Sequence, residues 1–437
     1  MPVEKYYDPD IETINRMALE KLQLERLQQQ VSRCYEKSDF YRERLDKSGV
    51  KPDDVKSLND IVRIPVVTKE ELRAEQENYP PWGRFIVADQ SEWAELHPST
   101  GTTGRPVNTI WSKKDVKKIT DFTARLMYGF GVRRTDSIQN GFSYGLWVAG
   151  IAVHYASQKL GAFTIPIGAT LTDRHIDYLL NAGSTVLFAT PSFALYIAER
   201  LKSKGYDPDD TSLRIGSFGG EGGTENEATR NKLERRLGID AYDIFGLAEI
   251  GPTMSAECTA KDGLHWTEDH HLIEVINPDT MEPCEEGEMG ILTITHLTRE
   301  ATPMLRYWTN DYARLSKEPC QCGRTHARSP GGIMGRADDM VIYRGAKFYP
   351  VQVEKVVRAF EYCSDEFKIL LDQDQESKLE TCIIQVEIES SVEKNEAEKQ
   401  LKQALKEELL VTPKLELLEV GTLERTTFKA KRIKDKR

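Results

Sequence analysis

Short apolar runs alternate with longer amphipathic stretches through the middle of the chain. The apolar runs fall at residues 162–167, 185–189, 213–218 and 241–245, and they have the length and composition of buried strands. The stretches near 145–160, 173–182, 192–204 and 224–237 have helical patterns. Alternating strands and helices are typical of βαβ units. The pattern therefore predicts an α/β domain with mostly parallel sheets, whose ligands bind in the loops that follow the strands.

The pattern changes on both sides of this region. Near the N-terminus, apolar residues recur at three- and four-residue steps and predict a helix, which either packs on the main body or binds a partner. Residues 265–316 alternate as short β segments, and the region after Gly335 mixes strands with helices. We expect a helical N-terminal segment (1–75) packed on the main body, a large domain (76–337) with a β-rich subdomain at about 265–316, and a small α+β C-terminal domain (338–437).

Composition narrows the class of protein. A chain of 437 residues is expected to form two or three domains. Its formal charge of −11 argues against a nucleic-acid-binding protein. The sequence has no apolar run of membrane-spanning length and no secretory signal at its start, so we expect a cytoplasmic protein without a membrane partner. The last nine residues, KAKRIKDKR, are basic and predict either a solvated tail or a site for a phosphate-rich ligand.

The strongest local signal is the string STGTTGRP at residues 99–106. Two glycines and four hydroxyl residues within eight positions make a loop that bends freely and presents backbone N–H groups and hydroxyls to phosphate oxygens. The string lacks the lysine and spacing of a Walker A loop. Further glycine-rich loops follow predicted strands at 219–223 and 246–249.

The string at 99–106 closely resembles the phosphate loop of the adenylate-forming (AMP-binding, acyl-CoA synthetase) superfamily. Four further motifs follow in that superfamily's order: YDIFGLAE at 242–249, YWTND at 307–311, GRADD at 335–339 and FKAK at 428–431. Nearly the whole chain is similar to the phenylacetate–CoA ligase family, including the segments YYDPDIETI, YGLWVAGIAVHYASQKLGAFTIPIG, GLHWTEDHHLIEV and GRADDMVIYRGAKFYPVQVE.

The resemblance implies a two-step reaction. An aromatic carboxylic acid reacts with ATP to give an acyl adenylate and pyrophosphate, and coenzyme A then takes the acyl group. It also implies a large N-terminal domain and a small mobile C-terminal lid that turns about Asp338. Lys429 would be the catalytic lysine of the lid, with Lys431 as its rival, and Glu249 would hold Mg²⁺. A homodimer is implied only by this kinship.

The nucleotide contacts implied by the resemblance come from several segments: Ser99, Thr100, Gly101, Thr102, Thr103, Gly104, Gly220, Glu221, Asp243, Phe245, Gly246, Asp311 and Arg336. The acid pocket implied in the same way comprises Phe142, Tyr144, Trp147, Phe218 and Gly219. Its aromatic residues favour a flat aromatic acid, although aromatic residues also build ordinary cores. An alternative function keeps the adenylation step but passes the activated acid to an amine or a carrier protein instead of coenzyme A.

The seven cysteines are irregularly spaced, which excludes a disulfide scaffold. Cys320 and Cys322 form a C-x-C pair, and Cys258 and His265 lie further back in the chain. Thiolates with an imidazole suit tetrahedral Zn²⁺, and some relatives in the family carry a structural zinc. We therefore expect these four residues to hold zinc, with His326 as the rival fourth ligand. Reduced, buried cysteines without a metal are the alternative.

Overall fold

The computed structural model describes residues 4–99, 105–169, 171–373, 380–425 and 432–437. The chain forms two compact units. Unit 1 comprises Met1–Gly168 and Tyr242–Ile333, and unit 2 comprises Ala169–Ala241 and Met334–Arg437. Each unit is therefore assembled from two separate stretches of sequence.

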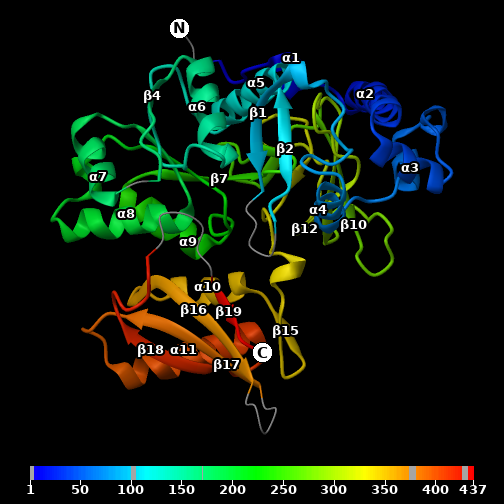
Figure 1. The fold of residues 1–437 in the computed structure, drawn as a ribbon. Helices are drawn as coiled ribbons and strands as arrows, with labels where there is room; N and C mark the ends of the chain where they lie inside the picture. The colour runs from blue at the N-terminus through cyan, green and yellow to red at the C-terminus, as the bar shows by residue number, and fades with distance from the viewer. Residues whose placement is uncertain (1–3, 100–104, 170, 374–379, 426–431) are drawn as a thin grey trace. The chain divides into compact units, whose positions relative to one another are not determined.

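Unit 1 combines N-terminal helices with a β-hairpin and antiparallel strands (Figure 1). Its helices are α1 (Pro9–Glu12), α2 (Arg16–Lys37), α3 (Asp39–Lys47), α4 (Lys69–Asn78), α5 (Lys113–Gly129) and α6 (Val148–Leu160), with the 3₁₀ turns η1 (Pro52–Asp54), η2 (Leu58–Arg63) and η3 (Gln90–Glu92). Its strands are β1 (Trp93–Pro98), β2 (Asn108–Ser112), β3 (Ser137–Asn140), β4 (Phe163–Ile165), β7 (Asp240–Leu247), β8 (Gly251–Ala256), β9 (Leu264–Trp266), β10 (His271–Ile276), β11 (Gly290–His296), β12 (Tyr307–Ala313) and β13 (Arg328–Ser329).

The strands of unit 1 form several pairings. β1 and β2 pair antiparallel (Figure 1). The threonine-rich segment lies between them in the sequence. β10, β11 and β12 form an antiparallel sheet, and β7, β8, β9 and β13 also pair antiparallel. β3 and β4 are parallel. The short turn between β7 and β8 allows only the antiparallel arrangement, because a parallel pair needs a long crossover.

The N-terminal helices share a core with the β-rich part of unit 1. Leu27 and Val31 of α2 are fully buried in the same cluster as Trp266, Leu292 and Ile294. The apolar stripe near the N-terminus thus packs against the body of its own unit, where burying each large apolar side chain contributes about 1.5–3 kcal/mol.

Unit 2 combines two parallel strands and their helices with the C-terminal part of the chain. Its helices are α7 (Thr172–Asn181), α8 (Pro191–Ser203), α9 (Glu227–Leu237), α10 (Pro350–Ala359) and α11 (Lys394–Leu409), with the 3₁₀ turns η4 (Pro208–Asp210) and η5 (Ala337–Asp339). Its strands are β5 (Val186–Ala189), β6 (Ile215–Phe218), β14 (Val341–Tyr343), β15 (Ala346–Phe348), β16 (Cys363–Gln373), β17 (Glu380–Ile388), β18 (Lys414–Glu419) and β19 (Ile433–Asp435).

The C-terminal part is a small α+β fold. β16 and β17 pair antiparallel, while β18 and β19 add in parallel at the two edges. Helices α10 and α11 pack on this sheet through a core that includes Val353, Leu401 and Ile369. Because β19 belongs to the sheet and Arg432 pairs with Glu366, residues 432–437 do not form a free solvated tail.

The strands and helices predicted between residues 145 and 245 are confirmed as β4 to β7 and α6 to α9, and the α/β class is confirmed. β5 and β6 are parallel, as the alternating pattern predicts. Among the described residues, no helix is both long enough and apolar enough to cross a bilayer.

Candidate functional site

The β1–β2 hairpin closes the base of the threonine-rich loop. The buried Ser99 donates its backbone N–H to the carbonyl of Val107 at 2.8 Å, and its hydroxyl accepts the N–H of Val107 at 2.9 Å. The predicted phosphate contacts of the loop itself lie outside the described residues: Thr100, Gly101, Thr102, Thr103 and Gly104. The structure therefore describes the two ends of this loop, at Ser99 and Val107, and the phosphate contacts of the loop stay a prediction.

Strand β7 leads to a buried carboxylate. Asp243, Phe245 and Gly246 lie on the strand, and Glu249 follows in the turn to β8. A Cβ at Gly246 would lie 2.1 Å from the carbonyl oxygen of Pro252, so only glycine allows this close approach. The side chain of Glu249 is 5% exposed. The turn thus holds a carboxylate in a largely desolvated position.

Lys69 at the start of α4 is the ion-pair partner of that carboxylate, with its Nζ 3.0 Å from Oε1 of Glu249. The same helix face carries Arg73, whose Nε donates to the carbonyl of Arg105 at 2.9 Å. One turn further, the amide of Gln76 pairs with the backbone of Asn108 at 2.8 and 3.0 Å. This polar face of α4 was not predicted from the sequence, and it lies beside both the metal candidate Glu249 and the end of the predicted phosphate loop. The sequence signal for this face is the i, i+4, i+7 spacing of Lys69, Arg73 and Gln76, which places three polar residues on one side of a helix.

The ribose-binding candidate lies on β12. Asp311 is 2% exposed, and its N–H donates to Oγ1 of Thr309 at 3.0 Å. Alternate residues of this strand are buried, so Asp311 shares its inward side with Thr309. Trp308 lies on the other side, where its indole N–H donates to Oδ1 of Asn310 at 2.9 Å.

Unit 2 holds several further candidates. Phe218 ends β6 and is fully buried, and Gly219 and Gly220 continue from it. Glu221 accepts the backbone N–H of Ser192, at the start of α8, at 2.8 Å. This bond ties the glycine-rich segment to a helix N-terminus, where a carboxylate is favoured.

The predicted hinge is also in unit 2. Arg336 makes two bonds of 2.9 Å to the two carboxylate oxygens of Asp338. Both side chains are partly exposed, so the pair contributes little to stability. The predicted catalytic Lys429 and its rival Lys431 lie outside the described residues.

The aromatic candidates for the acid pocket in unit 1 lie between β3 and α6. The rings of Phe142 and Trp147 meet edge to face with centroids 5.2 Å apart. The hydroxyl of Tyr144 accepts from Nδ2 of Asn140 at 2.9 Å and lies 3.2 Å from Nδ1 of His154. The structure therefore brings the rings of Phe142 and Trp147 into contact, and Tyr144 lies in the same segment. Phe218 and Gly219 belong to unit 2.

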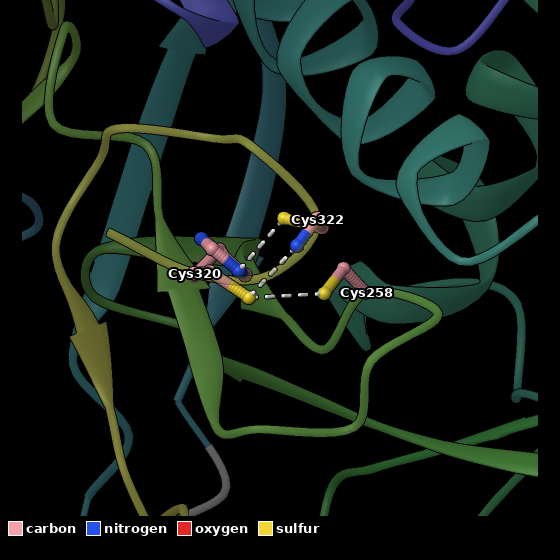
Figure 2. A group of neighbouring side chains, drawn as sticks. Cys258, Cys320 and Cys322 are labelled. Carbon is pink, nitrogen blue, oxygen red and sulfur yellow. Dashed lines mark hydrogen bonds between the residues drawn. The ribbon is translucent and has the colours of Figure 1, made fainter. Parts of the chain in front are cut away.

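Three thiols and an imidazole from distant parts of the sequence converge in unit 1. Cys258 follows β8, His265 lies on β9, and Cys320 and Cys322 lie in the loop before β13. One ligand atom from each residue lies within 4.8 Å of the others, and all four residues are buried. The sulfur atoms of Cys258 and Cys320 are 3.8 Å apart (Figure 2). Sγ of Cys322 is 3.6 Å from Nε2 of His265.

Backbone N–H groups point at the sulfur atoms of this cluster. The N–H of Ala260 donates to Cys258 at 3.4 Å, that of Cys322 to Cys320 at 3.5 Å, and that of Arg324 to Cys322 at 3.4 Å. Such donors stabilise thiolates, which are the form that binds zinc. The loops are therefore folded to hold negative charge on sulfur.

The three thiols of the cluster differ in ionisation. The hydrogen bond with Cys322, and then burial, raise the pKa of Cys258 above its ordinary value. Hydrogen bonds, first from Cys258 and then from His265, lower the pKa of Cys322 to about 2 against the effect of burial. Burial by itself disfavours the imidazolium, but hydrogen bonds with Cys320 and Cys322 raise the pKa of His265 to about 9. With a divalent cation bound, His265 would be neutral and the cysteines deprotonated, and the charge of the ion would offset that of the thiolates.

His326 is held away from the four converging ligands. Its Nδ1 lies 3.0 Å from the carbonyl of Trp266, and its Nε2 lies 3.1 Å from the carbonyl of Ile11. Both ring nitrogens thus face backbone oxygens. Of the two histidines considered as the fourth ligand, the geometry selects His265.

Comparisons with known proteins agree with these motifs. The profile of the AMP-binding enzyme C-terminal domain matches residues 345–437. The phenylacetate–coenzyme A ligase of Thermus thermophilus is 39% identical over 384 residues, which cover 87% of this chain and 84% of the relative. The phenylacetate–coenzyme A ligase of Aromatoleum evansii is 36% identical over 450 residues, or 100% of this chain and 99% of the relative.

Solved structures agree as well. A crystal structure of 2-hydroxyisobutyryl-CoA ligase in complex with R3-HIB-AMP is 28% identical, with a TM-score of 0.94, covering 100% of this chain and 93% of that one. The extent of the likeness, through both units, leaves no part of the chain unmatched. The chain therefore belongs to the phenylacetate–coenzyme A ligase family of adenylate-forming enzymes.

Proposed function

We propose that this chain is an ATP-dependent ligase that joins an aromatic carboxylic acid, of the phenylacetate class, to coenzyme A. The observation that carries the proposal is the 36% identity with a phenylacetate–coenzyme A ligase over the whole chain. In the first step the carboxylate attacks the α-phosphate of ATP, giving the acyl adenylate and pyrophosphate. In the second step the thiol of coenzyme A attacks the acyl carbon and AMP leaves. The full-length relationship favours coenzyme A over an amine or a carrier protein as acceptor.

The carboxylate of Glu249 fits Mg²⁺, because a hard cation prefers carboxylate oxygen. The ammonium of Lys69, 3.0 Å away, supports this assignment, since the position is built to face a positive charge. Mg²⁺ would offset the charge of the ATP phosphates when it is bound. Asp311 would accept hydrogen bonds from the ribose hydroxyls, and Phe245 would pack on the adenine.

The C-terminal part would supply the remaining cations. Lys429 lies in the matched C-terminal domain and would place its ammonium against the substrate carboxylate and the α-phosphate. A contact of this kind is worth about 100–1,000-fold in rate. Arg336 would assist at the ribose. Rotation of the C-terminal domain about Asp338 would replace the arrangement in which the acyl adenylate forms by the one in which coenzyme A reaches it.

The cysteine cluster would hold one structural Zn²⁺. Three thiolates and one imidazole make a closed tetrahedral set, which leaves no open position for a substrate. His265 would bind the metal through Nε2, the ring nitrogen that lies 3.6 Å from Sγ of Cys322. The metal would fix the loop that carries Cys320 and Cys322 to the strands before it.

The free state of all seven cysteines and the need for reduced thiolates at the zinc cluster favour a reducing compartment, which we propose is the cytoplasm. We also propose a homodimer, on the family relationship alone. Light scattering on the purified protein measures the assembly state directly.

The function is tested by acid-dependent exchange of pyrophosphate into ATP across a panel of phenylacetate, benzoate-type and indoleacetate-type acids. We expect exchange with at least one aromatic acid, and release of AMP with thioester formation when coenzyme A is added. Exchange with no aromatic acid would contradict the substrate class. Exchange without thioester formation would contradict coenzyme A as the acceptor.

A further inference from the structure

One rung of the β1–β2 hairpin connects three segments of the proposed active site. His97 and Thr109 are paired across the hairpin, directly below the closed base of the phosphate loop. The hydroxyl of Thr109 donates to the carbonyl of His97 at 2.7 Å, and the carbonyl of Ala248 lies 3.2 Å from the same hydroxyl. Ala248 directly precedes the metal candidate Glu249. This rung therefore lies between the phosphate loop and the turn that holds the carboxylate.

The ring of His97 extends the rung toward the acid-binding segment. His97 is buried, and its ring lies 4.3 Å from the ring of Trp111, centroid to centroid. Nε2 is 3.0 Å from Oε2 of Glu95, and Nδ1 is 3.3 Å from the carbonyl oxygen of Leu146. Both ring nitrogens thus face oxygen atoms, one on the strand of His97 itself and one on the segment that leads to α6.

Glu95 supplies the negative partner of this ring. Its second oxygen accepts the hydroxyl of Tyr155, on α6, at 2.8 Å. Burial alone would raise the pKa of Glu95, but hydrogen bonds from His97 and Tyr155 lower it below its ordinary value. The carboxylate therefore stays charged, and it orients the ring so that Nδ1 points at Leu146.

Leu146 belongs to the segment that carries Phe142, Tyr144 and Trp147. The start of this segment is fixed by Asn140, whose Oδ1 accepts the N–H of Phe142 at 3.2 Å. Near its other end, the side chain of Leu146 is 60% exposed, so its packing on the protein is weak. The bond from His97 to the backbone of Leu146 holds that weakly packed end, one residue before Trp147.

We propose that His97 is a positioning residue for the acid pocket, which holds the segment 141–147 in register with the strand that enters the phosphate loop. The inference rests on the proposed function and assigns this role to a residue outside the adenylation motifs. Because the contact is made to the backbone of Leu146, it sets the place of the aromatic side chains and does not touch the acid itself. The loss of this contact therefore acts on acid binding more than on ATP binding.

Two substitutions separate the two sides of the ring. Asparagine places an amide donor near the position of Nδ1, and glutamine places one near the position of Nε2. His97→Asn keeps a donor for Leu146, whereas His97→Gln keeps only the contact with Glu95. We expect His97→Gln to raise the KM for the aromatic acid about tenfold, as for the loss of one buried hydrogen bond, with the KM for ATP within about twofold. His97→Asn should restore the acid KM to within about twofold of wild type.

The measurement is pyrophosphate exchange with the acid and ATP varied in turn, and thermal melts report folding. If His97→Gln does not fold, Glu95→Gln keeps the shape and removes the charge that orients the ring, and it should raise the acid KM in the same way. If the wild type is active and His97→Gln leaves the acid KM unchanged, or raises both KM values equally, this inference alone is overturned. A wild type inactive with every aromatic acid overturns the proposed function and this inference with it.

Discussion

The pairing of Lys69 with Glu249 gives the sharpest stability prediction. The side chain of Glu249 is 5% exposed and that of Lys69 is 26% exposed. The carboxylate therefore has less water to stabilise its charge and depends more on the ion pair than the ammonium does. Lys69→Met keeps the length and packing of the aliphatic stem and removes the charge. The variant leaves a carboxylate without its counter-charge in a nearly dry position, which is a destabilising arrangement.

The distance sets the size of the effect. Two unit charges 3.0 Å apart attract by about 5–6 kcal/mol at an effective dielectric constant of about 20. Partial exposure of Lys69 and the desolvation of both groups offset much of this, so we expect a net loss of about 2 kcal/mol. For a cooperative unit of this size, that corresponds to a fall in Tm of about 4–8 °C.

A double-mutant cycle measured by thermal melting, without nucleotide and at one scan rate, separates this pair from other effects of α4. In the Glu249→Gln background, Lys69→Met should change Tm by less than about 2 °C, because the charge that needed a partner is gone. Glu70→Gln, on the exposed side of the same turn, is the matched control and should leave Tm within about 1 °C. Equal losses from Lys69→Met in both backgrounds would refute the pairing as the cause.

Three further predictions concern the lid, the metal and pH. Lys429→Ala should lower acid-dependent pyrophosphate exchange about 100–1,000-fold, while thioester formation from a supplied acyl adenylate survives. Lys436→Ala, at an exposed position, is the control. Loss of both half-reactions in Lys429→Ala would contradict the two-step assignment. Elemental analysis should find about one zinc per chain, which Cys322→Ser loses and Cys284→Ser retains, whereas a stable, metal-free wild type would exclude the site. Burial lowers the pKa of His270 to about 4, below its unfolded value, so its contribution to stability is complete above pH about 6.5 and is lost as the pH falls. That loss reaches about 2 kcal/mol at pH 5. Burial also lowers the pKa of the neighbouring His271, to about 3, so His270→Gln should make the fall of Tm with falling pH shallower without abolishing it; an unchanged slope would argue against the buried neutral ring.

The sequence predicts best where the chemistry lies in consecutive residues. Glu249 ends the motif at 242–249, and the structure buries it in the turn after β7, while its metal role stays a prediction. Cys320 and Cys322 are two positions apart, and their loop brings both sulfur atoms to the cluster. The sequence could not decide whether His265 or His326 is the fourth candidate zinc ligand, because the answer depends on which of the two rings already has other hydrogen-bond partners. His326 is occupied by two carbonyl oxygens that lie far away in sequence.

Contacts between segments that are distant in the sequence could not be predicted, because they too depend on how the elements pack. Nothing in the sequence near Lys69 refers to Glu249, and nothing near His97 refers to Leu146, since each contact is created by the packing of one element on another. Amphipathic spacing indicates which face of α4 is polar but not what that face meets. The direction of β8 against β7 was likewise decided by the length of the connecting turn and not by strand composition.

The N-terminal segment contacts two of the candidate sites directly. A boundary at residue 75 would fall inside α4, which runs from Lys69 to Asn78. Before that helix, Glu12 pairs with Arg324 at 2.6 Å, next to the cysteine cluster. One segment thus contacts the metal candidate Glu249 of the proposed nucleotide site through Lys69, and the cysteine loop through Glu12. Both contacts are made by largely buried carboxylates. Removing the segment would leave the charge of Glu249 without its partner and the loop after Cys322 without the ion pair of Arg324. We therefore expect unit 1 to require these residues for its own fold.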